Sequence, residues 1–204
     1  MDDTKKHWEK VYESKSPKEV SWFTAKPSVS LDLISKIHLS RDAKIIDVGG
    51  GASNLVDHLL DLNFHHLAVL DISSQAITHS KNRLGINATK VQWIEADVTK
   101  CQPLGPFDFW HDRAVFHFLT NQNDRDQYKA LLHGSLASGT KFILATFAPD
   151  GPDKCSGLAV CKYSSQDIMR EFDSKFTMLD EVAEVHCTPW GSEQKFIYFL
   201  MQKK

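Results

Sequence analysis

Three consecutive glycines at residues 49–51 follow directly after a short apolar run, and they constrain the fold of this chain more than any other feature. The run, residues 44–48, is rich in β-branched side chains and contains one acid, Asp47. A tight turn from a strand into a helix needs glycine, because a Cβ would block the backbone and any ligand lying over it. Since residues 53–62 then read as a helix, the segment predicts a strand–turn–helix unit.

An acidic residue closes the next apolar run. Asp71 follows residues 66–70 and lies about 20 residues beyond the glycines, the spacing at which a carboxylate reaches a ribose diol in nucleotide-binding sheets. Two strand ends, a glycine turn and this acid together predict a nucleoside pocket. Two purely structural interpretations stay open: the glycines could form an unliganded turn, and Asp71 could cap a helix at residues 73–83.

The glycine spacing distinguishes between two kinds of nucleoside cofactor. In the dinucleotide fingerprint Gly-x-Gly-x-x-Gly, Asn54 stands where the third glycine belongs, and Asp47 has no role. The segment instead resembles motif I of the class I S-adenosylmethionine-dependent methyltransferases, commonly Asp/Glu-x-Gly-x-Gly-x-Gly. Asp47, Gly49 and Gly51 match that motif. Ser53 replaces the third glycine at a position where serine is a good helix cap.

Two later segments carry the same resemblance. Residues 91–98 resemble the third strand of that family, whose terminal acid, here Asp97, typically accepts a hydrogen bond from the adenine amine. Residues 106–113 resemble the fourth strand and its polar exit. The resemblance covers residues 44–147 and implies a Rossmann-like fold, S-adenosylmethionine as the cofactor, and methyl transfer. For Asp97 the alternative is an ordinary loop acid.

The resemblance also implies a role for each cofactor-binding residue. The glycines would leave bare backbone beside the methionine part of the cofactor, Asp47 would orient its amino group, and Asp71 would accept both ribose hydroxyls. S-Adenosylmethionine carries a sulfonium and an ammonium but no phosphate, so three acids and a glycine turn without Lys or Arg suit it better than a pyrophosphate. The implied cofactor-binding set is Asp47, Gly49, Gly50, Gly51, Asp71, Ile72, Asp97, Val98 and His111.

Two histidines follow the fourth strand, whose exit faces the transferred methyl group in this fold. His111 and His117 are the candidate catalytic bases, because the unperturbed pKa of histidine lies near neutrality. His111 could equally contact the cofactor or cap the next helix, and His117 could be an ordinary histidine on a helix at residues 113–118. Asp112 and Arg113 between them are expected to form an ion pair that braces the loop.

Further side chains are candidates for closing the acceptor pocket. Aromatic residues precede the first strand, Trp190 lies near the C-terminus, and a cysteine lies in the breaker-rich segment 149–157. The aromatic residues could equally belong to the core, and the cysteine could be an ordinary loop thiol. The expected substrate and lid set is Tyr12, Trp22, Phe23, Arg113 and Cys155.

Family resemblance narrows the acceptor only in part. The opening His7-Trp8-Glu9-x-x-Tyr12, followed by residues 20–23, is similar to the N-termini of some seven-strand protein-lysine methyltransferases. Those enzymes commonly carry Asp-Lys-Gly-x-x-Asp after the fourth strand, where this chain has Asp-Arg-Ala at residues 112–114. Thiopurine and thiol methyltransferases, which the chain also resembles, often show an aspartate–arginine pair there. We therefore expect a small-molecule or thiol-like acceptor, with a protein lysine, or a non-catalytic nucleoside-binding module, as the alternatives.

The order of the predicted elements favours an α/β fold. Strands expected at 44–48, 66–70, 91–94, 107–110 and 140–147 alternate with helices expected at 53–62, 74–83, 113–118 and 124–136. Such alternation predicts a doubly wound, mostly parallel seven-stranded sheet with helices on both faces. After a helix at 165–172, the runs 178–187 and 195–202 predict an antiparallel hairpin edge. A single methyltransferase domain is expected over 1–204, with a helical lid at 1–40 and a Rossmann-like core at 41–204.

Composition and charge exclude several classes of function. The net charge of −2 gives no sign of the basic surface that nucleic-acid binding requires. No apolar run approaches the roughly 20 residues needed to span a bilayer, so no membrane partner is expected. The four cysteines contain no Cys-x-x-Cys pair, so neither a metal site nor a disulfide scaffold is favoured. The polar N-terminus does not read as a signal peptide, and a cytoplasmic location is the expectation.

Overall fold

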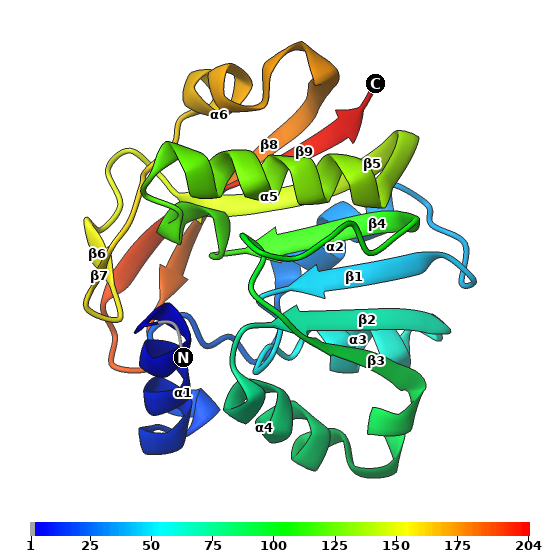
Figure 1. The fold of residues 1–204 in the computed structure, drawn as a ribbon. Helices are drawn as coiled ribbons and strands as arrows, with labels where there is room; N and C mark the ends of the chain where they lie inside the picture. Colours follow the sequence, from blue (N-terminus) through cyan, green and yellow to red (C-terminus); the bar gives the residue numbers. More distant parts are fainter. Residues whose placement is uncertain (1–2) are drawn as a thin grey trace.

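A seven-stranded sheet forms the centre of this computed structural model, which describes residues 3–204. Its strands are β1 (Lys44–Val48), β2 (His66–Asp71), β3 (Val91–Glu95), β4 (Phe107–Arg113), β5 (Leu136–Phe147), β8 (Phe176–Cys187) and β9 (Glu193–Lys203). Their order is β3-β2-β1-β4-β5-β9-β8, in which β1 to β5 run parallel and β9 runs antiparallel to both its neighbours (Figure 1). The predicted doubly wound sheet and its antiparallel C-terminal edge are confirmed.

Helices cover both faces of the sheet. They are α1 (Asp3–Ser14), α2 (Ser28–Lys36), α3 (Leu55–Asp61), α4 (Ser74–Leu84), α5 (Gln122–Ser135) and α6 (Ser165–Phe172), with short 3-10 turns η1 (Pro17–Glu19), η2 (Gly85–Lys90), η3 (Phe116–Phe118) and η4 (Asp173–Lys175). One apolar core joins α5 and α6 to the sheet, and a second joins α2 and α3 to the opposite face. In Figure 1, α5 crosses in front of the strands while α2 and α3 lie behind them.

The central strands are apolar because they are covered on both sides. All but the first residue of β1 and of β2 are buried, as expected for parallel strands between two helical layers. Side chains alternate between the two faces of a strand, so β1 contributes Ile46 and Val48 to one core and Ile45 to the other. This double burial leaves the strand ends as the places where polar side chains gather.

The segment before β1 divides into two parts. Helix α2 packs Leu33 and Ile34 into the core behind the sheet. Helix α1 lies instead beside α4, below the hairpin formed by β6 (Lys154–Cys155) and β7 (Leu158–Ala159) (Figure 1). Met1 and Asp2, the first residues of the expected lid, lie outside the described residues. Residues of the lid segment before α2 line the pockets at the strand ends.

Two local predictions were wrong. No α-helix forms at 113–118: β4 continues to Arg113, and Ala114 has a φ of 74°, which ends the strand in a left-handed turn before the short η3. The segment 149–157 is not only a loop, because residues 154–159 fold back as the β6–β7 hairpin. Its turn places Ser156 and Gly157 at φ values of 50° and 80°, the conformation of a tight two-residue hairpin.

Gly49→Ala tests how tightly the glycine turn is packed. Gly49 has a φ of +71°, and a Cβ there would lie 2.1 Å from Val115 Cγ2, so the change combines left-handed strain with overpacking. We expect a loss of about 2–5 kcal/mol in the free energy of unfolding, measured by urea denaturation. Gly139→Ala is the matched control, because its φ is +82° but no atom lies within 4 Å of the added Cβ. Equal losses in the two variants would contradict close packing at the turn.

Candidate active site

Two adjoining pockets open at the carboxyl ends of the central strands. The larger has a volume of about 360 Å³ and the smaller about 50 Å³. Open α/β sheets bind their ligands at this edge. The two pockets share four lining residues, Tyr12, Trp22, Gly49 and Arg113, and are therefore neighbours.

The glycine turn separates the end of β1 from α3 and brings bare backbone against two carboxylates. A Cβ on Gly50 would lie 2.2 Å from Asp47 Oδ2, and a Cβ on Gly51 would lie 2.6 Å from Asp71 Oδ2. The Gly51 N–H donates to Asp71 Oδ2 at 2.9 Å. Only glycine allows the two acids to come this close to the turn.

Asp71 ends β2 and is held by two backbone donors. Besides the Gly51 bond, Asp71 Oδ1 accepts from the Ser73 N–H at 2.8 Å. Burial raises the pKa of this carboxyl to about 6, and the two N–H bonds act in the opposite direction. Each oxygen keeps a further lone pair for a ligand hydroxyl. The predicted helix-cap role is not taken by Asp71, because Ser73 itself caps α4 by accepting from the Ala76 N–H at 3.1 Å.

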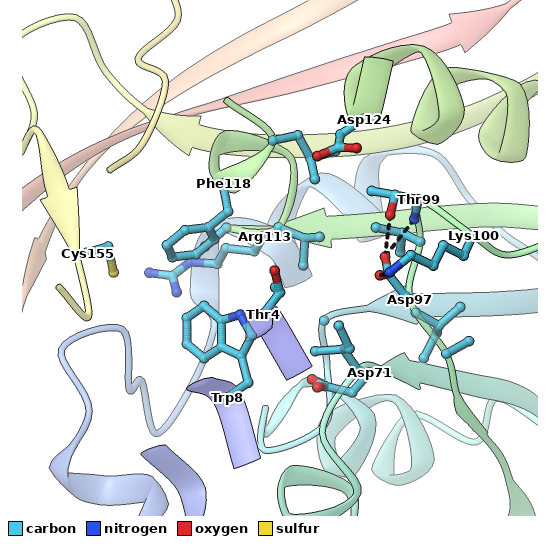
Figure 2. A pocket seen from close by; sticks show the side chains of 18 of the residues that line it. Thr4, Trp8, Asp71, Asp97, Thr99, Lys100, Arg113, Phe118, Asp124 and Cys155 are labelled. Carbon is cyan, nitrogen blue, oxygen red and sulfur yellow. Dashed lines mark hydrogen bonds and ion pairs between the residues drawn. The ribbon is translucent and has the colours of Figure 1, made fainter. Parts of the chain in front are cut away.

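Asp97 follows β3 and lies across the larger pocket from the aromatic residues (Figure 2). Asp97 Oδ1 accepts from the Thr99 N–H and hydroxyl at 2.9 and 2.7 Å, and Lys100 Nζ donates to Oδ2 at 3.0 Å. These bonds hold the pKa of Asp97 below its usual value despite partial burial. Asp97 is therefore a fixed, ionised acceptor at this end of the pocket.

Asp47 and His111 form a buried pair between β1 and β4. The two residues are register partners, and His111 Nδ1 lies 2.7 Å from Asp47 Oδ1. His111 Nε2 lies 2.9 Å from the hydroxyl of Ser30, a residue of α2. His111 borders the smaller pocket only, and both of its ring nitrogens are engaged. The second oxygen of Asp47, Oδ2, is buried without a hydrogen-bond partner among the described residues.

Asp112 and Arg113 do not form the predicted ion pair. They are consecutive residues of a strand and so point to opposite faces of the sheet. Asp112 accepts from the Tyr128 hydroxyl at 2.6 Å and from the Val115 N–H at 2.9 Å. The partners of Arg113 lie on the other face: its Nε donates to the Tyr198 hydroxyl at 2.7 Å, and Glu184 lies 3.5 Å from Nη2.

Aromatic rings form the other end of the larger pocket. The Trp8 ring meets the Trp22 and Phe118 rings edge to face, with centroids 5.7 and 5.0 Å apart. Arg113 Nη1 donates to the Trp22 carbonyl at 3.1 Å. Figure 2 shows Trp8, Phe118, Arg113 and Cys155 gathered on one side of the pocket, opposite Asp71 and Asp97. We call the group of Trp8, Trp22, Phe118, Arg113 and Cys155 the aromatic end.

Cys155 and His117 are the remaining candidates for a nucleophile or a base, and neither is charged near neutral pH. Burial raises the pKa of the Cys155 thiol to about 11, so it is a neutral side chain. His117 is fully buried, and burial lowers its pKa to about 3. Its Nδ1 accepts from the Phe147 N–H at 3.3 Å, and its ring packs on Phe118, which places it in the core rather than in a pocket wall.

A carboxylate of α1 fastens that helix to the start of α4. Glu9 accepts from the Ser73 and Ser74 hydroxyls at 2.8 and 2.9 Å, and from the Ser74 and Gln75 N–H groups at 2.9 and 3.0 Å. A carboxylate is favourable at a helix N-terminus because free N–H groups and the helix dipole converge there. These bonds hold Trp8 and Tyr12 over the pocket.

The predicted site residues divide between the two pockets. The larger is lined by Tyr12, Trp22, Gly49, Asp71, Ile72, Asp97, Val98, Arg113 and Cys155. The smaller is lined by Tyr12, Trp22, Phe23, Asp47, Gly49, Gly50, His111 and Arg113. Gly51, His117 and Trp190 line neither, although Gly51 fixes Asp71.

Sequence reasoning missed three residues of the site. Trp8 precedes Tyr12 by one helical turn, so their shared helix face was the available signal. Phe118 was missed because residues 113–118 were wrongly predicted to form a helix. No local sequence pattern marks Ser30. Within residues 3–204, no three His, Cys, Asp or Glu side chains are grouped to hold a metal, and no helix has the length and apolar character to cross a bilayer.

Comparison with known proteins agrees with this geometry. A family model described as a methyltransferase domain matches residues 46–142. A structure from a study of the conversion of a disulfide bond into a thioacetal group during echinomycin biosynthesis has a TM-score of 0.78 at 15% identity, covering 98% of this chain and 93% of that one. A SAM-dependent methyltransferase from Anabaena variabilis ATCC 29413 has a TM-score of 0.76 at 13% identity, covering 100% and 96%.

A curated relative matches this chain over only a small part of its own length. The eEF1A lysine and N-terminal methyltransferase of Bos taurus is 24% identical over 123 residues, which make up 58% of this chain and 17% of that longer protein. The chain has the Rossmann-like fold of the class I S-adenosylmethionine-dependent methyltransferases, and its residues 46–142 match a methyltransferase domain.

The pH dependence of ligand binding tests the role of Asp71. Ionised Asp71 can accept two ribose hydroxyls, whereas the protonated acid must donate its hydrogen. Because its pKa is raised to about 6, the affinity for S-adenosylhomocysteine should fall as pH drops through that value, by at most about tenfold per pH unit. Isothermal titration between about pH 5 and 8 measures this.

Asp71→Asn should bind more weakly and lose the titration. 5′-Methylthioadenosine, which keeps the ribose but lacks the amino acid, should show the same pH dependence as S-adenosylhomocysteine on the native protein. A midpoint that survives in Asp71→Asn would assign the titration to another group.

Proposed function

We propose that this methyltransferase transfers the methyl group of S-adenosylmethionine to a small-molecule, thiol-like acceptor. The observation that carries the proposal is the aromatic end of the larger pocket. Of the five side chains that form the aromatic end, Arg113 is the one ionised group, and none can act as a base. The other charged residues that line the larger pocket, Asp71, Asp97, Lys100 and Asp124, are not part of this group. S-Adenosylmethionine supplies an already activated methyl carbon, so the protein mainly positions the reactants.

The residues present fit the cofactor. Asp47 Oδ2 is a buried oxygen in need of a donor, which an ammonium group provides. Asp71 is placed for the ribose hydroxyls and Asp97 for the adenine amine, with Ile72 and Val98 beside the ring. The glycine turn leaves the space that side chains would fill. The three carboxylates suit a ligand with two positive charges.

The size and walls of the larger pocket support a small acceptor. A volume of about 360 Å³ is near the lower limit for small-molecule sites, and part of it is needed for the nucleoside. Helix α1 covers this space and is fastened by Glu9, so we propose that residues 3–24 act as the lid. Trp8 and Phe118 would then pack against an acceptor held beside Arg113.

The missing base supports a thiol over an amine. His111 has both ring nitrogens engaged, and His117 lies outside both pockets, so neither of the two predicted bases faces the aromatic end. A thiol with a pKa of about 8.5 is partly ionised near neutral pH, whereas a lysine amine with a pKa of about 10.4 must first lose a proton. The Arg113 guanidinium would further favour the thiolate, which is the nucleophilic form.

A protein-lysine acceptor is the second candidate. The matching segment of the bovine eEF1A lysine and N-terminal methyltransferase favours it. A non-catalytic nucleoside-binding module is the third candidate. The assays described below distinguish the three candidates.

Three probes that share one ring test the acceptor atom directly. We expect the protein with labelled S-adenosylmethionine to methylate thiophenol at least about 10²-fold faster than benzylamine or phenol. The last two must lose a proton near neutral pH, and base assistance is worth roughly 10²–10⁴-fold. Mass spectrometry of the methylated products measures the three rates. Equal rates, or a preference for benzylamine, would contradict the thiol proposal.

A cell extract separated by size extends the test to natural acceptors. Label in the low-mass fraction is the expected outcome. Label on one protein band would favour the lysine candidate instead. Calorimetric binding of S-adenosylhomocysteine without label in any fraction would leave only the binding module.

A further inference from the structure

Three buried polar side chains form a chain of hydrogen bonds behind the glycine turn. The Ser30 hydroxyl lies 2.9 Å from His111 Nε2, and His111 Nδ1 lies 2.7 Å from Asp47 Oδ1. The exposed fractions of Ser30, His111 and Asp47 are 0%, 2% and 3%. These hydrogen bonds join α2 and β1, which are consecutive elements, to β4, which is distant in the sequence.

The acceptors and donors fix the direction of these bonds. A carboxylate only accepts, so His111 Nδ1 must carry the hydrogen that it donates to Asp47. In the neutral ring Nε2 is then an acceptor, and the Ser30 hydroxyl donates to it. Asp47 thus selects the tautomer, and the Ser30 hydroxyl supports it by donating to Nε2. The other tautomer would place two acceptors, Nδ1 and Oδ1, against each other at 2.7 Å.

This series of hydrogen bonds ends at Asp47 Oδ2, the carboxylate oxygen that has no partner among the described residues. With Oδ1 bonded to His111, the carboxylate can turn only as far as that bond allows, which fixes Oδ2. Oδ2 lies where a Cβ of Gly50 would be, within 2.2 Å, and Asp47 lines the smaller pocket with Gly49 and Gly50. A fixed acceptor beneath bare backbone suits a ligand ammonium group.

We propose that Ser30 and His111 are positioning residues for the amino-acid end of the cofactor, acting through Asp47. This inference rests on the proposed function and gives His111 a role other than that of a base. It also makes α2, which packs behind the sheet, part of the cofactor site.

A pair of ligands separates this role from a general structural one. S-Adenosylhomocysteine has the amino-acid end, and 5′-methylthioadenosine lacks it. Ser30→Ala should weaken binding of the first by about two- to tenfold, the worth of one hydrogen bond, and leave the second unchanged. Ser35→Ala is the matched control on α2, because its exposed hydroxyl bonds only to the Asp32 carbonyl of its own helix. Isothermal titration measures both affinities, and the second ligand reports whether each variant has folded.

Two variants of His111 test which nitrogen matters. His111→Asn keeps a donor near the Nδ1 position, whereas His111→Gln places its amide near Nε2 and loses the donor to Asp47. Asn should retain more S-adenosylhomocysteine affinity than Gln, with the affinity for 5′-methylthioadenosine equal in both. Equal losses for both ligands in both variants would overturn the positioning role.

The tautomer can be read without any ligand. Nitrogen NMR of the ligand-free protein should show His111 protonated at Nδ1 and not at Nε2, and Ser30→Ala should reduce that preference. The opposite tautomer in the native protein would overturn the inference. If the native protein bound neither ligand, both the proposed function and this inference would fail. If the native protein bound both ligands, and every variant kept the native ratio of S-adenosylhomocysteine affinity to 5′-methylthioadenosine affinity, only the inference would be overturned.

Discussion

Two backbone N–H groups hold the Asp71 carboxylate at the edge of the sheet, and the remainder of the site is arranged around it. The donors come from Gly51, in the turn after β1, and Ser73, at the start of α4. The first bond requires the turn to approach within a distance that no Cβ at Gly51 would permit. Glu9 then fastens α1 to the same start of α4, which brings α1 over the pocket. Asp71, the glycine turn and α1 thus share one hydrogen-bonded junction.

The charge distribution across the larger pocket divides it into two chemically different ends. Asp71 and Asp97 make one end negative, whereas the aromatic end carries the Arg113 guanidinium over the Phe196 ring, 4.4 Å from its centroid. A positively charged cofactor is favoured at the first end and an electron-rich acceptor at the second. The buried hydrogen bonds of Ser30, His111 and Asp47 lie beneath the glycine turn, at a third position, which we propose for the amino-acid end of the cofactor. This arrangement supports the proposal that methyl transfer proceeds by positioning rather than by proton removal.

The parts of the molecule that local chemistry determines were predictable from the sequence. Apolar runs predicted the parallel strands, and the glycines with the terminal acids predicted the edge of the sheet where the two pockets open. The acceptor side was not predictable in the same way, because its residues meet only through tertiary contacts. Residues 113–118 were predicted as a helix, yet Ala114 takes a left-handed conformation as its N–H bonds to the Ala145 carbonyl. Arg113 finds its partners on β8 and β9, and Ser30 reaches His111 across 81 residues of sequence.

A crystal structure of the protein with S-adenosylhomocysteine tests the central claim most directly. The account predicts the ribose hydroxyls on Asp71, the adenine beside Asp97 and the amino group on Asp47 Oδ2, with the sulfur directed toward Trp8, Phe118 and Arg113. A complex in which the ligand binds elsewhere, or in which these three carboxylates make no contact with it, would contradict the account.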